Sequence, residues 1–168
     1  MKKNLQYSFN SSLLLVVFIS ILLSNCSSSK QTASDASNAA IAEAINKNEW
    51  VFTANYVIPQ SGRSRTTNSL YTVTYSDNKF LVSLPYFGKA YTASIGSSQS
   101  PLDFKSSDFE INKEMKKQGE WAITVKPKDY SEVQTLNFTL YENGSADLGV
   151  TLTNRSPISF RGTVSPKK

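Results

Sequence analysis

The sequence predicts a mainly β protein, with a single antiparallel β-sandwich or barrel-like domain of about eight strands and a short N-terminal α-helix. From Trp50 onward, apolar and polar residues alternate, which is typical of half-buried strands. Turn-forming residues recur roughly every eight to twelve positions, a spacing that favours an all-β sandwich or barrel. The sequence shows no internal repeat, so we expect one domain over residues 35–168.

Length and composition are those of one globular domain of ordinary size. The chain has 168 residues, of which 39% are apolar and 18% charged, so it is too apolar and too weakly charged for global disorder. Its formal net charge of +5 is mild, and no run of Lys and Arg is longer than two residues. We therefore expect no nucleic acid among its partners.

The absence of histidine narrows the chemistry open to this chain. The sequence contains no His, and Cys26 is its only cysteine. Catalysis by Ser-His-Asp or Cys-His groups is therefore excluded, as is a disulfide within the chain. Zinc, copper and haem sites lose their usual ligands, and we expect no metal and no cofactor. No carboxylate pair stands out either, so we expect no catalytic residue; a carboxylate-based hydrolase is the less favoured alternative.

The N-terminus has the features of a signal peptide over residues 1–25. Lys2 and Lys3 form a positive start, and the apolar run 13–23 is too short to span a bilayer as a helix but suits a secretory signal. The following Leu-Ser-Asn-Cys at 23–26 resembles the bacterial lipobox, although Asn stands where Gly, Ala or Ser is common. This resemblance implies cleavage before Cys26 and a lipid anchor on that residue. The alternative is an ordinary signal peptide with a free Cys26.

The segment after Cys26 predicts a tether and then a helix. Residues 26–34 comprise the lipidated cysteine and a polar, small-residue flexible tether. Residues 35–48 read as a short helix, capped by Ser34 or Asp35. Its thin apolar stripe predicts a helix that lies against the domain, and the stripe is formed by Ala36, Ala40, Ile41, Ala44 and Ile45.

Eight segments with strand-like patterns follow, connected by turns and polar loops. In order, they are residues 50–58, 70–75, 79–84, 109–115, 121–125, 133–141, 146–152 and 158–164. Tight turns are predicted at Ser76-Asp77-Asn78 and around Gln118-Gly119. Asn143-Gly144 is the strongest hairpin indication, since a type I′ turn needs positive φ at both central residues. Loops are expected at 60–68 and 97–101.

Several stretches resemble a family of Bacteroidetes lipoproteins called domain of unknown function 4251. The most specific is the run Leu-Pro-Tyr-Phe-Gly-Lys-Ala-Tyr at 84–91, and a second is Asn-Arg-Ser-Pro-Ile-Ser-Phe-Arg-Gly at 154–162. Phe-Thr-Ala at 52–54 and Pro-Leu-Asp-Phe at 101–104 also correspond, although the second lacks the family's glycine. The resemblance implies a single-domain envelope lipoprotein and carries no activity or catalytic residue. No acidic cluster follows Cys26, which favours an outer-membrane anchor facing the periplasm over surface export.

The run at 84–91 also holds the candidate contact residues. Tyr86, Phe87 and Tyr91 could line the mouth of a pocket, with Lys89 offering a charge to an anionic group. Pro85 cannot donate to a strand ladder, so the strand ends there or lies at an edge. The alternative is a structural corner whose aromatic rings plug the core.

Three charged groups are interpreted more simply. Asp103, Asp108 and Glu110 lack the spacing of a calcium loop and read as solvated. Residues 113–120 read as a charged hairpin tip in water. Arg63 and Arg65 lie in a flexible loop and could clamp an anion, but a solubilising role is the favoured interpretation.

These observations predict a non-enzymatic domain held at the membrane through Cys26 that binds a small amphiphile or an envelope protein. A structural or assembly role in the outer envelope is the alternative.

Overall fold

The computed structural model describes residues 29–91 and 100–167. The chain divides into two compact units, Met1–Ser34 and Asp35–Lys168, and the architecture below is that of the second unit. The predicted signal peptide, the lipobox with Cys26, and residues 97–99 of a predicted loop lie outside the described residues. Within the described part, no helix is both long enough and apolar enough to span a bilayer.

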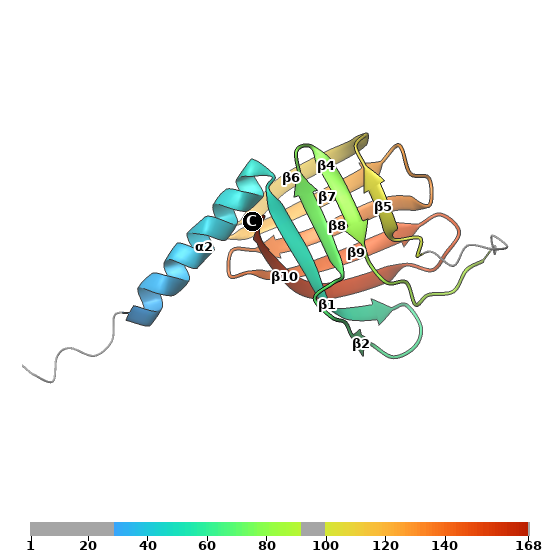
Figure 1. The fold of residues 1–168 in the computed structure, drawn as a ribbon, viewed down its shortest axis with the longest axis horizontal. Coiled ribbons are helices and arrows are strands. Elements are labelled where there is room, and N and C mark those ends of the chain that lie inside the picture. Colours follow the sequence, from blue (N-terminus) through green and yellow to red (C-terminus); the bar gives the residue numbers. More distant parts are fainter. Residues whose placement is uncertain (1–28, 92–99, 168) are drawn as a thin grey trace, which may run out of the picture. The chain divides into compact units, whose positions relative to one another are not determined.

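The second unit is built on one antiparallel sheet of ten strands that curls into a half-barrel (Figure 1). The strand order is β5-β4-β3-β1-β10-β9-β8-β7-β6, with the short β2 paired to β1. The strands are β1 (Trp50–Pro59), β2 (Arg65–Thr66), β3 (Thr72–Ser76), β4 (Lys79–Ser83), β5 (Asp103–Ser106), β6 (Phe109–Lys117), β7 (Glu120–Pro127), β8 (Val133–Tyr141), β9 (Ser145–Leu152) and β10 (Ile158–Pro166).

All eight predicted strands are present, and the mainly β fold class is confirmed. Two further strands, β2 and β5, are short and polar, so alternation did not reveal them. The interpretation of 113–120 as a hairpin tip is wrong for its first half, because β6 continues to Lys117 and only Gln118-Gly119 connects it to β7.

Positive φ occurs in three hairpin turns, including Gly119 with φ of 76° between β6 and β7, but the type I′ turn is not at Asn143-Gly144. Asp77 and Asn78 have φ of 50° and 54°, so they form a two-residue turn of the I′ kind between β3 and β4. Between β8 and β9 only Gly144 is left-handed, with φ of 84°. The Gly144 amide donates to the Tyr141 carbonyl at 3.0 Å, which closes a β-turn before that glycine. The predicted Asn143-Gly144 hairpin is therefore present, with a three-residue loop in place of a type I′ turn.

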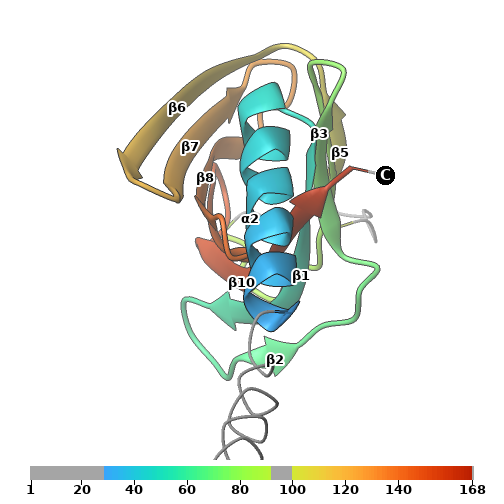
Figure 2. The ribbon, with the colours of Figure 1, turned by 90° about the vertical axis from the view of Figure 1, so that its left-hand side faces the viewer.

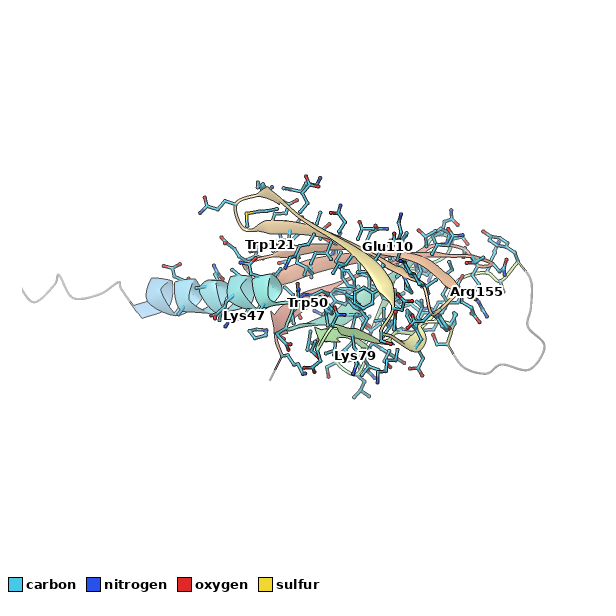
Figure 3. All side chains as sticks on the ribbon, turned by 90° about the horizontal axis from the view of Figure 1, so that it is seen from above. Lys47, Trp50, Lys79, Glu110, Trp121 and Arg155 are labelled. Carbon is cyan, nitrogen blue, oxygen red and sulfur yellow. The ribbon has the colours of Figure 1, made fainter. Side chains whose placement is uncertain are left out.

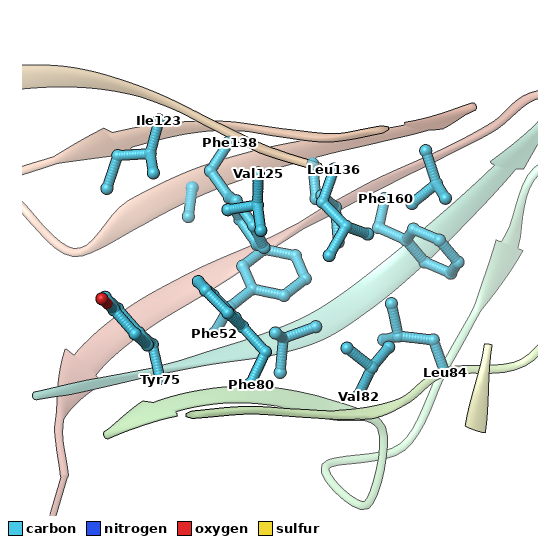
Figure 4. Packing of buried hydrophobic residues seen from close by; sticks show 14 of the residues in the cluster. Phe52, Tyr75, Phe80, Val82, Leu84, Ile123, Val125, Leu136, Phe138 and Phe160 are labelled. Carbon is cyan, nitrogen blue, oxygen red and sulfur yellow. The ribbon is translucent and has the colours of Figure 1, made fainter. Parts of the chain in front are cut away.

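The concave face of the sheet carries the hydrophobic core (Figure 4). Strand burial alternates as expected, and side chains from β1, β3 and β4 face those from β7, β8 and β10 across the interior. Trp50 is fully buried, and its ring contacts Tyr75, Phe80 and Phe138 edge-on with centroids 5.1–6.2 Å apart. Among the described residues, all core side chains lie in the unit Asp35–Lys168, so this unit has a hydrophobic core of its own.

The helix α2 (Ser29–Lys47) meets one end of the curled sheet with its last turns (Figure 2). It begins at Ser29, inside the segment predicted as a tether, since residues 29–34 contain no Gly or Pro to stop a helix. Ile41, Ala44 and Ile45 are buried, whereas Ala36 and Ala40 are exposed, so only the second half of the predicted stripe packs.

The C-terminus of α2 is fastened to the sheet. Asn48 has φ of 61°, and Glu49 donates its amide to the Ala44 carbonyl at 2.9 Å, as in a Schellman cap. Lys113 of β6 brings its ammonium to the carbonyls of Ile45 and Asn46, both at 3.1 Å, and to Asn48 Oδ1 at 2.8 Å. The Lys113 ammonium thus donates to two carbonyls of the last helical turn, of which that of Ile45 also accepts the Asn48 amide at 3.2 Å.

Candidate functional site

The segment after β4 turns away from the sheet and docks on the loop before β10. Leu84 and Pro85 are buried, and β4 ends at Ser83 as the proline predicts. Ala90 forms an antiparallel bridge with Arg155, and the Tyr91 amide donates to the Asn154 carbonyl at 2.9 Å. We call residues 84–91 together with 154–156 the aromatic corner. It joins two of the stretches that carry the family resemblance, 84–91 and 154–162.

Tyr86 is the structural centre of the aromatic corner. Its hydroxyl lies 2.9 Å from the Ser156 carbonyl oxygen and 3.1 Å from that of Lys89. The buried Ser156 accepts the Lys89 amide on Oγ at 2.9 Å and donates its own amide to the Lys89 carbonyl at 2.9 Å. Gly88 makes this possible, because a Cβ at that position would overlap both the Tyr86 hydroxyl and Ser156 Oγ.

The outer side of the corner exposes two aromatic rings among cationic side chains. Phe87 is 43% exposed and Tyr91 is 68% exposed. The Arg65 guanidinium carbon lies 4.8 Å from the centre of the Phe87 ring, and that of Arg155 lies 5.5 Å from the Tyr86 ring. Both distances suit cation–π contacts. Lys89 is exposed beside them.

The charge of this surface is positive. Arg65 and Lys89 have no ion-pair partner among the described residues. Arg155 has one weak partner, with its Nε 3.9 Å from a Glu132 carboxylate oxygen. The outer face of the corner therefore combines exposed aromatic rings with cationic side chains.

The structure separates the four candidate residues into two roles. The Tyr86 hydroxyl donates to the Lys89 backbone carbonyl, so these two residues lie together. Tyr86 therefore has a structural role, as in the alternative interpretation of this run as a structural corner. Phe87 and Tyr91 are not plugs of the core, since both are exposed. Sequence reasoning treated Arg65 as solubilising and did not single out Arg155. The signal that could have identified Arg155 is its position in residues 154–162, the second stretch that resembles the family.

The acidic candidates do not form a metal site. Among the described residues, no group of three His, Cys, Asp or Glu side chains could hold a metal ion. The acidic side chain with a marked structural role is instead Asp129, which closes the turn between β5 and β6. Its carboxylate accepts the Ser106 hydroxyl at 2.6 Å and the amides of Ser107 and Asp108 at 2.8 and 3.1 Å. These hydrogen bonds, chiefly that from Ser106, lower the pKa of Asp129 to about 2.

The interior offers apolar surface and little polar chemistry. The buried polar side chains of the described residues are three serines, Ser76, Ser106 and Ser156, and none is a carboxylate. The carboxylate pair that a hydrolase would need is thus absent from the described core. The buried indole nitrogen of Trp50 has no hydrogen-bond partner and lies among aromatic rings.

Comparisons with known proteins identify a family and a crystal structure to which the chain is similar. The family model described as "Domain of unknown function (DUF4251)" matches residues 32–164. The crystal structure of a DUF4251 family protein from Bacteroides eggerthii DSM 20697 is similar, with a TM-score of 0.59 and 15% identity. That similarity covers 82% of this chain and 92% of the other, and at this identity it speaks for the fold alone. No curated protein matches the chain.

Proposed function

The chain belongs to the DUF4251 family, and from that premise we propose that it is a non-enzymatic envelope lipoprotein that binds a partner protein through the outer face of its aromatic corner. The observation that carries the proposal is the exposure of Phe87 and Tyr91 beside Arg65 and Lys89. Aromatic residues and arginine are enriched where proteins bind one another, because they combine large contact area with directed polar groups.

A partner protein is favoured over a small amphiphile by the packing of the concave face. Core side chains from both halves of the sheet meet there, and Phe80, Phe138 and Phe160 are at most 2% exposed. Stacked and edge-on rings occupy the space in which a barrel of this kind would hold a ligand. The exposed rings of the corner instead lie on an outward surface, which suits contact with a second macromolecule.

The positive charge of the corner points to an acidic segment on the partner. Arg65 lies over Phe87 and is exposed, so its guanidinium can donate hydrogen bonds to a carboxylate, and the Lys89 ammonium is exposed as well. An acidic peptide with apolar side chains would cover the rings and neutralise the cations. Such complementarity mainly sets specificity and the association rate.

The address of the protein rests on residues 23–26 and is part of the same proposal. A lipid on Cys26 would hold the domain at the outer membrane, facing the periplasm, and would restrict its partners to the envelope. Exchange of Cys26 for Ala in the full chain should move the protein from the membrane fraction to the soluble fraction. Retention of the Cys26→Ala variant in the membrane fraction would contradict a lipid anchor.

Photo-crosslinking in cells of the bacterium that makes the protein tests the binding surface. A photoreactive phenylalanine analogue replaces Tyr91 in the full chain, and in a matched control it replaces Asn137, an exposed residue on β8. We expect a protein adduct of discrete mass from position 91 and none of that mass from position 137.

Two outcomes would contradict the proposal. The same adducts from both positions would indicate collision without a specific surface. If position 91 forms an adduct only with lipid or another small molecule, the ligand is a small amphiphile and not a protein.

A further inference from the structure

A second surface, away from the aromatic corner, has the features of an anion site. A hollow of about 310 Å³ lies on the outer face of β3, β4 and β5, and we call it the β3–β5 hollow. It is lined by Thr74, Ser76, Asp77, Lys79, Leu81, Lys105 and Lys167. Lys79 and Arg155 are labelled in different parts of Figure 3, which shows that the hollow and the corner are separate places.

The register of the strands builds this hollow. Leu81 on β4 is paired with Thr74 on β3 and with Lys105 on β5. These three side chains therefore form a row across the outer face. Lys79 is two residues from Leu81 on the same face and is paired with Ser76. Diagonal neighbours in a sheet lie roughly 7–8 Å apart, close enough for two lysine ammoniums to reach one small anion.

The ammonium of Lys167 is held at the hollow by two of the residues that line it. Lys167 brings its Nζ to Ser76 Oγ at 2.8 Å and to a carboxylate oxygen of Asp77 at 3.3 Å. Asp77 is the single acidic residue among those lining the hollow, which also include three lysines. Within the part of the chain that the structure describes, no ion pair involves Lys79 or Lys105. The lining therefore carries a positive charge that its own residues do not neutralise.

We propose that the β3–β5 hollow binds a phosphate group. Three ammoniums around one hollow supply the point charges that lysine brings to phosphate, and the hydroxyls of Thr74 and Ser76 supply neutral hydrogen bonds. The phosphate belongs either to a free anion or to a phospholipid headgroup. Leu81, 55% exposed among the lysines, distinguishes these sources, because it would contact the glycerol part of a lipid and nothing of a free phosphate.

The first arm of the test uses inorganic phosphate. Residues 35–168, labelled with ¹⁵N, are titrated with phosphate while amide shifts are recorded, with sodium chloride at equal ionic strength as a reference. We expect saturable shifts at Ser76, Asp77 and Lys105. The double variant Lys79→Gln, Lys105→Gln should bind phosphate at least about tenfold more weakly, because it removes two of the three positive charges that attract the anion.

The second arm uses vesicles. The same unit is sedimented with vesicles of phosphatidylglycerol and phosphatidylcholine, and separately with phosphatidylcholine alone. If the source is a phospholipid, Leu81→Ser lowers vesicle binding without changing the phosphate titration. If the source is a free anion, only the first arm responds to Lys79→Gln, Lys105→Gln.

A matched control separates the hollow from general charge. The variant Lys116→Gln, Lys126→Gln removes two exposed lysines outside the hollow and changes the net charge equally. Equal losses in the two double variants, in either arm, would overturn the proposal. So would the absence of saturable shifts together with the absence of vesicle binding.

Discussion

Gly88 is required by space and not by backbone conformation. Its φ is not positive, yet a Cβ there would overlap the Tyr86 hydroxyl and Ser156 Oγ. We therefore expect Gly88→Ala to lower the free energy of unfolding by about 1–3 kcal/mol, the usual cost of overpacking. Urea unfolding measures this change. Gly149→Ala is the control, because a Cβ at Gly149 meets nothing within 4 Å, and it should change stability by less than about 0.5 kcal/mol.

The carboxylate of Asp129 makes the fold sensitive to acid. Its folded pKa of about 2 lies below the ordinary value of 3.8, so its contribution is present above pH 4 and is lost as the pH falls toward 2. Because the group is exposed, solvent screening limits the effect, and Asp129→Asn should cost about 1 kcal/mol at pH 7 and almost nothing at pH 2.

Unfolding by urea at the two pH values measures this difference. The control is Asp108→Asn, since the Asp108 side chain takes no part in the three hydrogen bonds to Asp129. A loss in Asp129→Asn that is equal at pH 7 and pH 2 would contradict the assigned role of the charge.

At the residue scale, the sequence singles out the segment that forms the aromatic corner, but not which of its side chains are held and which are exposed. The run at 84–91 was singled out, and Pro85 correctly ended the strand. The partner of Tyr86 is Ser156, 70 positions away, so no local pattern could show which ring would be held and which exposed. The contact of Arg65 with Phe87 is equally non-local.

Among the elements, the junction of α2 with β6 depends on one side chain. Lys113 donates to the carbonyls of Ile45 and Asn46 and to Asn48 Oδ1, and partial burial lowers the pKa of its ammonium. Lys113→Met keeps the aliphatic stem and removes these bonds. We expect unfolding to become easier by about 1–2 kcal/mol, with faster amide exchange over the last turns of α2.

Hydrogen exchange read by mass spectrometry tests this junction. Lys116→Met on the same strand is the control, since Lys116 is exposed and its ion pair is with Glu114 on its own strand. Unchanged exchange in α2 of the Lys113→Met variant would show that apolar packing alone holds the helix.

Local elements were the most predictable part of the fold. Alternating residues located every long strand, since burial on one face requires that pattern. The charged stretch 113–120 suggests a hairpin tip, although β6 extends to Lys117, because this edge strand has no buried residue to give an alternating pattern. Charged side chains on such an edge are a known protection against pairing with other chains.

For the whole molecule, the half-barrel is set by pairings that the sequence does not display. β1 and β10 form the long central pair, with Trp50 opposite Pro166, although they lie near opposite ends of the domain. Hairpins are local and can be read from turns, whereas this pairing closes the chain on itself. The sequence therefore predicted an antiparallel sandwich or barrel and could not choose between them.

One shared core should give one unfolding transition. Leu136 on β8 is fully buried, and Leu136→Ala should lower the free energy of unfolding by about 2–5 kcal/mol. Leu70→Ala removes the same atoms at a site that is 76% exposed and should cost less than about 0.5 kcal/mol. Urea unfolding followed by Trp fluorescence and by circular dichroism checks both values, and non-coincident curves would contradict a single core.

The binding role of the aromatic corner is tested most directly by the crosslink yield at position 91 after a nearby charge is reversed. Lys89→Glu is compared with Lys126→Glu, an equal charge change on an exposed residue of β7. We predict that Lys89→Glu abolishes the protein adduct from position 91, and that Lys126→Glu leaves it unchanged. Equal yields in the two variants would contradict recognition of an acidic partner at this surface.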